Sequence, residues 1–317
     1  MVRARFWLSC DLNLKESKNR TLVYMTHSLK DYLNVIIVIV IASVIAFACG
    51  HNGLNFNGWP IIFICMSISF IVHWIAFIPS YIARTEKYYD ISGTVAYMCV
   101  LFTAYHLTSS VSVDALNTRS IVAIVLVSAW ALRLGFFLFI RVLKVGEDRR
   151  FREVKERFSG FLVWWTISAL WVFLTTVNAL VMIINNVEYH DDLFFYFGLI
   201  IWIIGFSFEV IADEQKRRFR LQSSNKDQFI SNGLWSISRH PNYFGEILLW
   251  IGMAIIAYPT LQGWQNISLI SPVFIYYLLT KISGVNLLEG HADKKWGGNQ
   301  SYEEYKRNTS VLIPYLK

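Results

Sequence analysis

The sequence is poor in cysteine and in charged residues. Its four cysteines, Cys10, Cys49, Cys65 and Cys99, form no CxxC pair and no paired spacing. This argues against a disulfide framework or a zinc site, and no metal site is predicted. Only 16% of the residues are charged, against about 25% in soluble domains. With 55% hydrophobic residues and a mean hydropathy of +0.42, this shortage predicts a polytopic membrane protein without a large soluble core.

The chain also lacks an early apolar run, an internal repeat and a long linker. Its first 32 residues are polar and mixed in charge, so no cleavable signal peptide is expected. We therefore predict two parts. A polar cytosolic segment, disordered or loosely attached, covers residues 1–32, and one transmembrane domain covers 33–317.

What the sequence has in abundance is long apolar runs. A helix needs about 20 apolar residues to cross some 30 Å of hydrocarbon. Runs of this kind predict an all-α transmembrane bundle of about seven or eight spans. The predicted spans are 33–49, 60–83, 92–108, 121–140, 161–184, 193–212, 243–258 and 267–288.

The positive charges favour eight spans with both termini in the cytosol. In that arrangement the cytosolic segments carry 26 of the 29 Lys and Arg residues, as the positive-inside rule requires. A count of seven would break the rule after the miscounted span. The net charge of +7 then reflects cytosolic loops, and no nucleic-acid partner is expected.

Polar residues gather at the predicted cytosolic ends of the fourth, sixth, seventh and eighth spans. These ends read "RVLKVGEDRRFREVKERFSG", "FEVIADEQKRRFR", "GLWSISRHPNYFGE" and "LLEGHADKKWGGNQSYEEYKRN". Arginine suits phosphate, because its planar guanidinium makes two parallel bonds. Together with aromatic, amide and carboxylate groups, this composition predicts a site for a phosphorylated nucleotide. A basic loop can equally serve topology and lipid headgroup contact alone.

Two features at these ends need a specific explanation. Arg133 stands in "WALRLGFFLFI", so it should have a counter-ion, with Glu209 or Glu246 as candidates, or face a cavity. In "SRHPNYFGE", Pro241 can start a helix, since its missing N–H is no loss there. Asn242 and Glu246 then lie four residues apart on one helix face.

The stretch "GLWSISRHPNYFGEILLWIG" resembles the signature of the steroid 5-alpha-reductase-like membrane family. "WALRL", "YYDISGT", "FEVIADEQKRRFR" and "SGVNLLE" are also similar to that family, in the same order, from about residue 84 to the end. The resemblance implies an integral membrane reductase. NADPH would bind among the cytosolic ends of the later helices, and a hydride would pass to an electron-poor C=C of a lipid-like enone.

The resemblance also implies site residues. "NYFGE" is similar to the stretch whose Asn and Glu contact the cofactor in steroid reductases. "EVIADEQKRRFR" is similar to Asn-x3-Asp-x3-Arg-x2-Arg, with Glu209 in place of Asn. Tyr97 is the expected proton donor or carbonyl partner. The expected cofactor-binding residues are Arg133, Asp213, Arg217, Arg220, Arg239, His240, Asn242, Tyr243, Glu246, Tyr302 and Tyr305. Of these, Arg217, Arg220 and Arg239 are expected to hold the 2′-phosphate and the pyrophosphate.

Two other readings stay open at this stage. Membrane isoprenylcysteine carboxyl methyltransferases share Arg-His-Pro-x-Tyr-x-Gly, and would place S-adenosylmethionine at the same face. A non-catalytic sterol-binding protein with the same fold is the third possibility. We also expect a lipid-like substrate from the bilayer and no obligate protein partner. If the protein is eukaryotic, its expected location is the endoplasmic reticulum.

Overall fold

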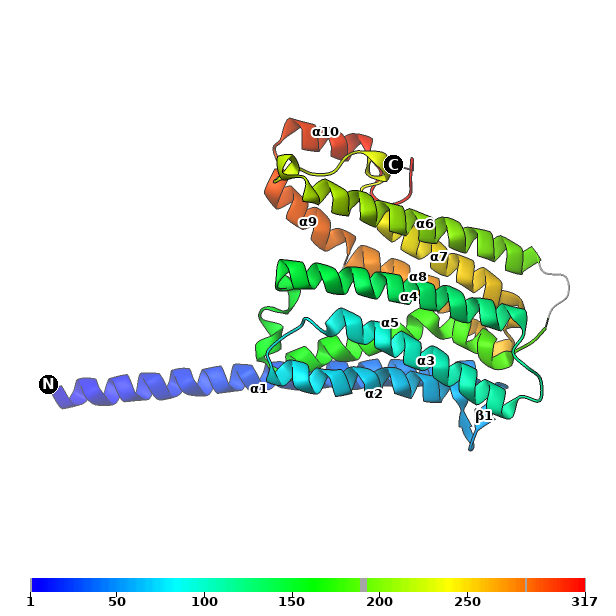
Figure 1. Ribbon diagram of the computed structural model, residues 1–317. Helices are drawn as coiled ribbons and strands as arrows, with labels where there is room; N and C mark the ends of the chain where they lie inside the picture. Colours follow the sequence, from blue (N-terminus) through cyan, green and yellow to red (C-terminus); the bar gives the residue numbers. More distant parts are fainter. Residues whose placement is uncertain (1, 189–192, 283, 317) are drawn as a thin grey trace.

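The protein is almost entirely helical in the computed structural model, which describes residues 2–188, 193–282 and 284–316 (Figure 1). The side chains of residues 2–25, Val145 and Arg149 are outside the description. The main helices are α1 (Val2–Gly50), α2 (Ile61–Ile82), α3 (Tyr89–Val111), α4 (Thr118–Val145), α5 (Phe158–Asn185), α6 (Leu193–Leu221), α7 (Pro241–Ala257), α8 (Ile270–Tyr277), α9 (Val285–Trp296) and α10 (Gln300–Asn308). The strands β1 (Asn55–Phe56) and β2 (Trp59–Pro60) pair antiparallel between α1 and α2.

The predicted membrane spans are confirmed. In the described part of the chain, eight helical segments are long and apolar enough to cross a membrane. They are Thr26–Gly50, Ile61–Ile82, Tyr89–Val111, Thr118–Lys144, Phe158–Asn185, Leu193–Leu221, Pro241–Thr260 and Gly263–Trp296. Each predicted span falls within one of these segments or overshoots it by one residue.

The eighth span is made of several helical segments. A 3₁₀ segment (Gly263–Leu269) leads into α8, a π-helical turn (Leu278–Ile282) follows, and α9 starts anew after it. A Cβ added to Gly284 would lie 2.1 Å from the Leu279 carbonyl oxygen. This close backbone approach lets the chain turn sharply into α9. Ser283, in the "SGVNLLE" motif, lies outside the described residues.

Helix α5 is the centre of the bundle. It contacts α1, α2, α3, α4, α7 and α8. Buried side chains occupy 83% of its most apolar stretch, against 22% for α6, which lies on the outside. Helix α5 is therefore the core around which the other helices pack.

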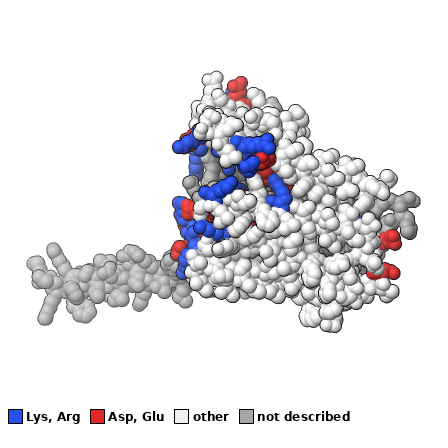
Figure 2. All heavy atoms as spheres, in the orientation of Figure 1, with Lys and Arg blue, Asp and Glu red and all other residues white. Residues whose placement is uncertain are grey.

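Positive charge lies at one end of the bundle, here called the basic end, where α4 and α6 finish and α7 begins. Figure 2 shows Lys and Arg side chains, with some Asp and Glu among them, around a hollow at this end, while Asp and Glu alone appear at the opposite end of the same face. The predicted topology also requires Lys and Arg to gather at one end of the bundle. Which end faces the cytosol stays a prediction.

Candidate active site

Helices α6 and α7 touch backbone to backbone, and this contact positions the acidic residues of the site. A Cβ added to Gly205 would lie 2.4 Å from a backbone nitrogen of α7. One added to Gly245 would lie 2.5 Å from the backbone nitrogen of Glu209. Only glycine permits helices to approach so closely. Glu209 is therefore held against the first turns of α7, which carry Asn242 and Glu246.

A buried ion-pair network joins α4 to this helix pair. Arg133 Nη1 lies 2.5 Å from Glu209 Oε1, and Arg133 Nη2 lies 2.5 Å from Asp213 Oδ2. Trp130 Nε1 donates to Glu209 Oε2 at 3.0 Å, and Asn242 Nδ2 donates to Asp213 Oδ1 at 3.2 Å. Both carboxylates are thus satisfied by donors from other helices, which fixes α4 against α6 and α7.

This network answers the question that Arg133 raised in the sequence. Of the two counter-ions predicted, Glu209 is a partner, and Asp213 is a second one. Arg133 does not line the neighbouring cavity. Its observed contacts are those of a structural ion pair, and its contact with a cofactor stays a prediction.

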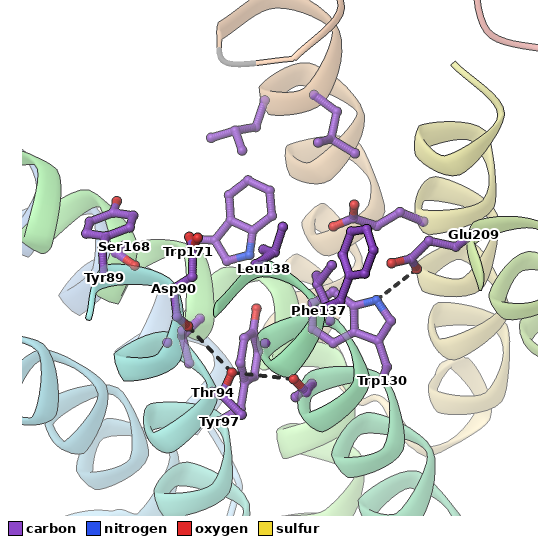
Figure 3. A pocket seen from close by; sticks show the side chains of 18 of the residues that line it. Tyr89, Asp90, Thr94, Tyr97, Trp130, Phe137, Leu138, Ser168, Trp171 and Glu209 are labelled. Atoms are coloured by element: carbon purple, nitrogen blue, oxygen red, sulfur yellow. Dashed lines mark hydrogen bonds between the residues drawn. The ribbon is translucent and has the colours of Figure 1, made fainter. Parts of the chain in front are cut away.

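A cavity of about 420 Å³ lies between α3, α4, α5, α6, α7 and the π-helical turn (Figure 3). Its size falls within the usual range of small-molecule sites. Asp90 and Tyr97 on α3 both line it, seven residues and therefore about 10 Å apart along the helix axis. The aromatic lining residues are Tyr89, Tyr97, Trp130, Phe137, Trp164, Trp171 and Tyr243. The predicted site residues in the lining are Tyr97, Asp213, Asn242, Tyr243 and Glu246.

Among the described residues, two that line the cavity carry buried polar atoms without a hydrogen-bond partner. Tyr97 is 5% exposed and its hydroxyl is unpartnered, as is Oε1 of Glu246, which is 6% exposed. In Figure 3 the Tyr97 hydroxyl points towards the space beside Trp171 and Leu138. Buried polar groups in folded proteins nearly always have a partner. These two atoms therefore mark where a polar ligand would bind.

Basic side chains line the cavity towards the basic end. Arg141 and Arg150 both contribute to the lining. Arg150 makes a two-pronged contact with Asp148, at 2.9 Å and 2.5 Å to Oδ2. Burial opposes ionisation of Asp148, but the hydrogen bonds and charge of Arg150 outweigh it and lower the pKa of Asp148.

The "SRHPN" motif starts α7 as predicted, with Pro241 at its first position. His240 Nε2 lies 2.8 Å from Glu289 Oε1 on α9, and Arg239 Nη1 lies 3.0 Å from Glu289 Oε2. The Arg239 backbone N–H donates to the Ser310 carbonyl at 2.8 Å. Burial lowers the pKa of His240, although its bond to Glu289 opposes the shift. Arg239 and His240 therefore fasten α9 and the C-terminal segment to α7, and neither lines the cavity.

The two predicted arginines on α6 differ in their surroundings. Arg217 donates to Glu214 at 2.6 and 2.8 Å on an exposed face. No such pair is found for Arg220 in the part of the chain that the structure describes, and the charge of Arg141 acts on it.

Tyr302 and Tyr305 lie on α10, away from the cavity lining. The Tyr302 hydroxyl donates to Asp293 Oδ1 at 2.9 Å, and the Tyr305 hydroxyl donates to the Trp235 carbonyl at 2.7 Å. Both contacts attach α10 to neighbouring segments at the basic end. A cofactor contact by either tyrosine stays a prediction.

Sequence reasoning did not single out several lining residues. Asp90 stands in "YYDISGT" and Trp130 in "WALRL", motifs that were recognised as family features without a role for these side chains. Arg141 is one of seven basic residues in the segment 141–160. No pattern in the sequence separates it from the other six.

Comparisons with known proteins agree with this architecture. The family described as "Protein of unknown function (DUF1295)" matches residues 76–309. The chain is 25% identical over 129 residues to "3-oxo-5-alpha-steroid 4-dehydrogenase 1" of Bos taurus, covering 41% of this chain and 45% of that protein. It is 26% identical over 131 residues to "Steroid 5-alpha-reductase DET2" of Gossypium hirsutum, covering 40% and 45%. The match thus spans less than half of these curated relatives. No solved structure matches the chain.

Proposed function

Since the chain belongs to the DUF1295 family and is steroid 5-alpha-reductase-like, we propose that it is a membrane reductase that uses NADPH to reduce a C=C of a lipid-like enone. The names of its distant relatives suggest an oxidoreductase acting on steroid-like substrates. Our proposal goes beyond these names in three details, which are the cofactor, the bond that is reduced and the lipid-like substrate.

The observation that carries the proposal is the unpartnered Glu246 oxygen in a cavity walled by aromatic rings. A nicotinamide ring is flat and bears a primary carboxamide. Its amide N–H can donate to Glu246, and the side-chain amide of Asn242 lines the same cavity. The residues present therefore fit this ring. When bound, NADPH would supply the hydride.

The carboxyl groups beside the cavity favour the same ligand. Glu209, Asp213 and Glu246 line it, and Arg133 is the cation paired with the first two. Carboxyl oxygens accept hydrogen bonds, so these side chains suit the N–H groups of a carboxamide, just as Asp213 accepts from the side-chain amide of Asn242.

We assign Tyr97 to the substrate. Its hydroxyl lies in the cavity lining and can donate a hydrogen bond to an enone oxygen. As a hydride adds to the β-carbon, an electron pair moves onto that oxygen, and a proton from water later completes the α-carbon. Donors of this kind are worth on the order of 10²–10³ in kcat.

The two rival functions differ in the ligand they need. A methyltransferase would bind S-adenosylmethionine, which carries no phosphate. A sterol-binding protein would need no nucleotide. Arg141 lines the cavity at the basic end and favours a phosphorylated ligand, whereas Arg150 is already paired with Asp148.

The deciding experiment is nucleotide binding by the protein purified in detergent. NADPH should bind, and S-adenosylmethionine should not. Asn242→Ala should weaken NADPH binding at least tenfold, because it removes an amide from the cavity. Asn308→Ala, an exposed change on α10, is the matched control and should bind as wild type does. Binding of S-adenosylmethionine instead would establish the methyltransferase, and binding of neither would favour the sterol-binding protein.

The membrane in which the reductase works is part of the same proposal. The eight apolar helices support an integral membrane protein. We expect it in the endoplasmic reticulum with the basic end towards the cytosol, where NADPH is available.

A further inference from the structure

Helix α5 presents polar side chains along one face, from the cavity towards the end of the bundle opposite the basic end. Spacings of four, three, four and three residues place the members of this stripe on one side of the helix. In order, they are Trp171, Thr175, Asn178, Met182 and Asn185. Trp171 lines the cavity together with Tyr97 (Figure 3). Thr175 and Asn178 are fully buried and lie one and two helical turns beyond Trp171.

A second set of polar side chains meets this stripe from the 3₁₀ segment before α8 and from the first turn of α8. Ser271 Oγ donates to the Thr175 carbonyl at 2.6 Å, and Asn185 Nδ2 donates to Gln265 Oε1 at 2.7 Å. These two contacts show that the two segments run antiparallel. Ser268 is fully buried and lies between the contacts, so it is opposite the middle of the stripe. We call this contact region the polar interface.

Four buried polar atoms that follow one another from the cavity into the polar interface lack a hydrogen-bond partner among the residues that the structure describes. They are the Tyr97 hydroxyl, Thr175 Oγ1, Asn178 Nδ2 and Ser268 Oγ. Buried polar groups in folded proteins nearly always have a partner. The missing partner must accept from the amide nitrogen and can donate to the hydroxyls. Water does both, and buried water typically bonds polar groups that would otherwise be unsatisfied.

The polar interface ends at an exposed turn. Gln265 and Asn185 exchange two side-chain hydrogen bonds, and Gln265 Nε2 also donates to the His51 carbonyl at 3.1 Å. His51 follows α1 and is exposed. Polar groups thus extend from the cavity to the surface at the end opposite the basic end. A nucleotide held at the basic end would leave this end accessible to water.

We propose that Thr175, Asn178 and Ser268 hold a water wire that carries protons from the exposed turn at His51 to the cavity at Tyr97. The inference rests on the proposed function, because reduction of an enone consumes one proton besides the hydride. One new C–H bond forms with the hydride at the β-carbon, an electron pair moves onto the enone oxygen, and the α-carbon then takes a proton from the water beside Tyr97. Each water in the wire passes one proton on and receives one from its neighbour. The wire is therefore restored after each turnover, and one proton is taken up from solvent.

The first test detects the water in the full-length protein in detergent, without any nucleotide. Brief X-ray irradiation converts bound water into hydroxyl radicals, which oxidise the side chains beside it, and the sulfur of methionine reacts readily. Met182 lies on the α5 stripe and is 1% exposed, whereas the control, Met66 on α2, is 5% exposed. Oxidation from bulk solvent would favour Met66, which is the more exposed of the two. Mass spectrometry should instead show faster oxidation of Met182.

Apolar variants of similar shape should remove the water. Thr175→Val and Asn178→Leu should each abolish the excess oxidation of Met182. Thr176→Val is the matched control, because the Thr176 hydroxyl is also fully buried but donates to the Val172 carbonyl at 2.7 Å. It should leave the oxidation of Met182 as in the wild type. If Met182 were oxidised no faster than Met66 in the wild type, or if both variants left its oxidation unchanged, there would be no water wire.

The second test asks whether the wire supplies the proton. With NADPH and a steroid 4-en-3-one as the enone, Thr175→Val and Asn178→Leu should lower kcat by about tenfold or more. They should also increase the effect of D₂O on kcat, while NADPH binds as it does to the wild type. An unchanged kcat and isotope effect would mean that the proton enters elsewhere, and would overturn the proposal. If Met182 were oxidised as expected but the wild type bound no NADPH and reduced no enone, the bound water would stand, and its role in proton supply would fail together with the reductase proposal.

Discussion

Replacing Arg133 with glutamine should destabilise the protein more than replacing an exposed charged residue with a neutral one. The side chain is 19% exposed and pairs at 2.5 Å with two carboxylates that are 2% and 8% exposed. Removing one partner of a buried ion pair costs about 3–5 kcal/mol, because the remaining charge stays buried. Here two carboxylates lose their shared cation. Trp130 and Asn242 are the donors that remain to them.

The assay is thermal unfolding of the purified protein in detergent. In a chain of roughly this length, a loss of 1 kcal/mol in the free energy of unfolding lowers the melting temperature by about 2 °C. Arg133→Gln should therefore lower the melting temperature by about 6–10 °C. Arg218→Gln is the control. Its pair with Glu214 is exposed and should contribute at most about 1 kcal/mol, or about 2 °C.

A double variant tests whether the loss comes from the network itself. Adding Asp213→Asn to Arg133→Gln removes one of the stranded charges, so the double variant should lose less than the sum of the two single variants. The reasoning would be refuted if Arg133→Gln melted within about 2 °C of the wild type. In that case the guanidinium would not be needed for the fold and would be free to bind a cofactor, as the family resemblance implies.

Further changes test the packing, the topology, the titration and the chemistry. Gly205→Val should lower the free energy of unfolding by about 3 kcal/mol and the melting temperature by about 6 °C, because a Cβ at this position would lie 2.4 Å from a backbone atom of α7. An unchanged melting temperature would disprove the close contact. A membrane-impermeant maleimide added to sealed microsomes should label Ser224→Cys and leave Asp114→Cys unlabelled, and labelling of both would contradict the eight-span topology. Burial lowers the pKa of His240 below its usual value near 6.5, so the unfolded chain takes up the proton first as the pH falls. The stability from neutral His240 is complete above about pH 6.5 and is lost as the pH falls through the folded pKa; His240→Gln should flatten this loss in melting curves. Tyr97→Phe should lower kcat on the order of 10²–10³-fold with little change in the melting temperature, since no hydrogen bond of the hydroxyl is found within the described part of the chain, and a large loss of stability would argue for a structural role.

The membrane architecture could be predicted from the sequence because it depends on the length and hydropathy of each segment taken by itself. Hydrocarbon excludes charge, so each span appears as an apolar run with polar ends. The start of α7 was predictable for a similar reason, since Pro241 marks the first helical position by its own chemistry.

The break after α8 depends on a contact between segments that are distant in the sequence. Such a contact cannot be inferred from one apolar stretch alone. The apolar stretch through Leu278 and Leu279 has the composition of a continuous helix. The chain bends because Gly284 packs against the Leu279 carbonyl and against the Tyr243 ring of α7. Lys281 inside the predicted span was the available signal that this stretch reaches the basic end.

The roles of the arginines at the site could not be predicted from the sequence for the same reason. A motif identifies Arg217, Arg220 and Arg239 as equivalent candidates for phosphate, because all three are cations near one end of the bundle. Carboxylates from α6 and α9 pair with Arg217 and Arg239, and no carboxylate pairs with Arg220 in the described chain. Which cation is available to a ligand is thus decided by acidic residues elsewhere in the fold. A stripe of Glu209, Asp213, Lys216 and Arg220 along α6 could nevertheless be read from helical spacing alone. It places Glu209 and Asp213 beside the cavity and Lys216 and Arg220 further along, towards the end of α6.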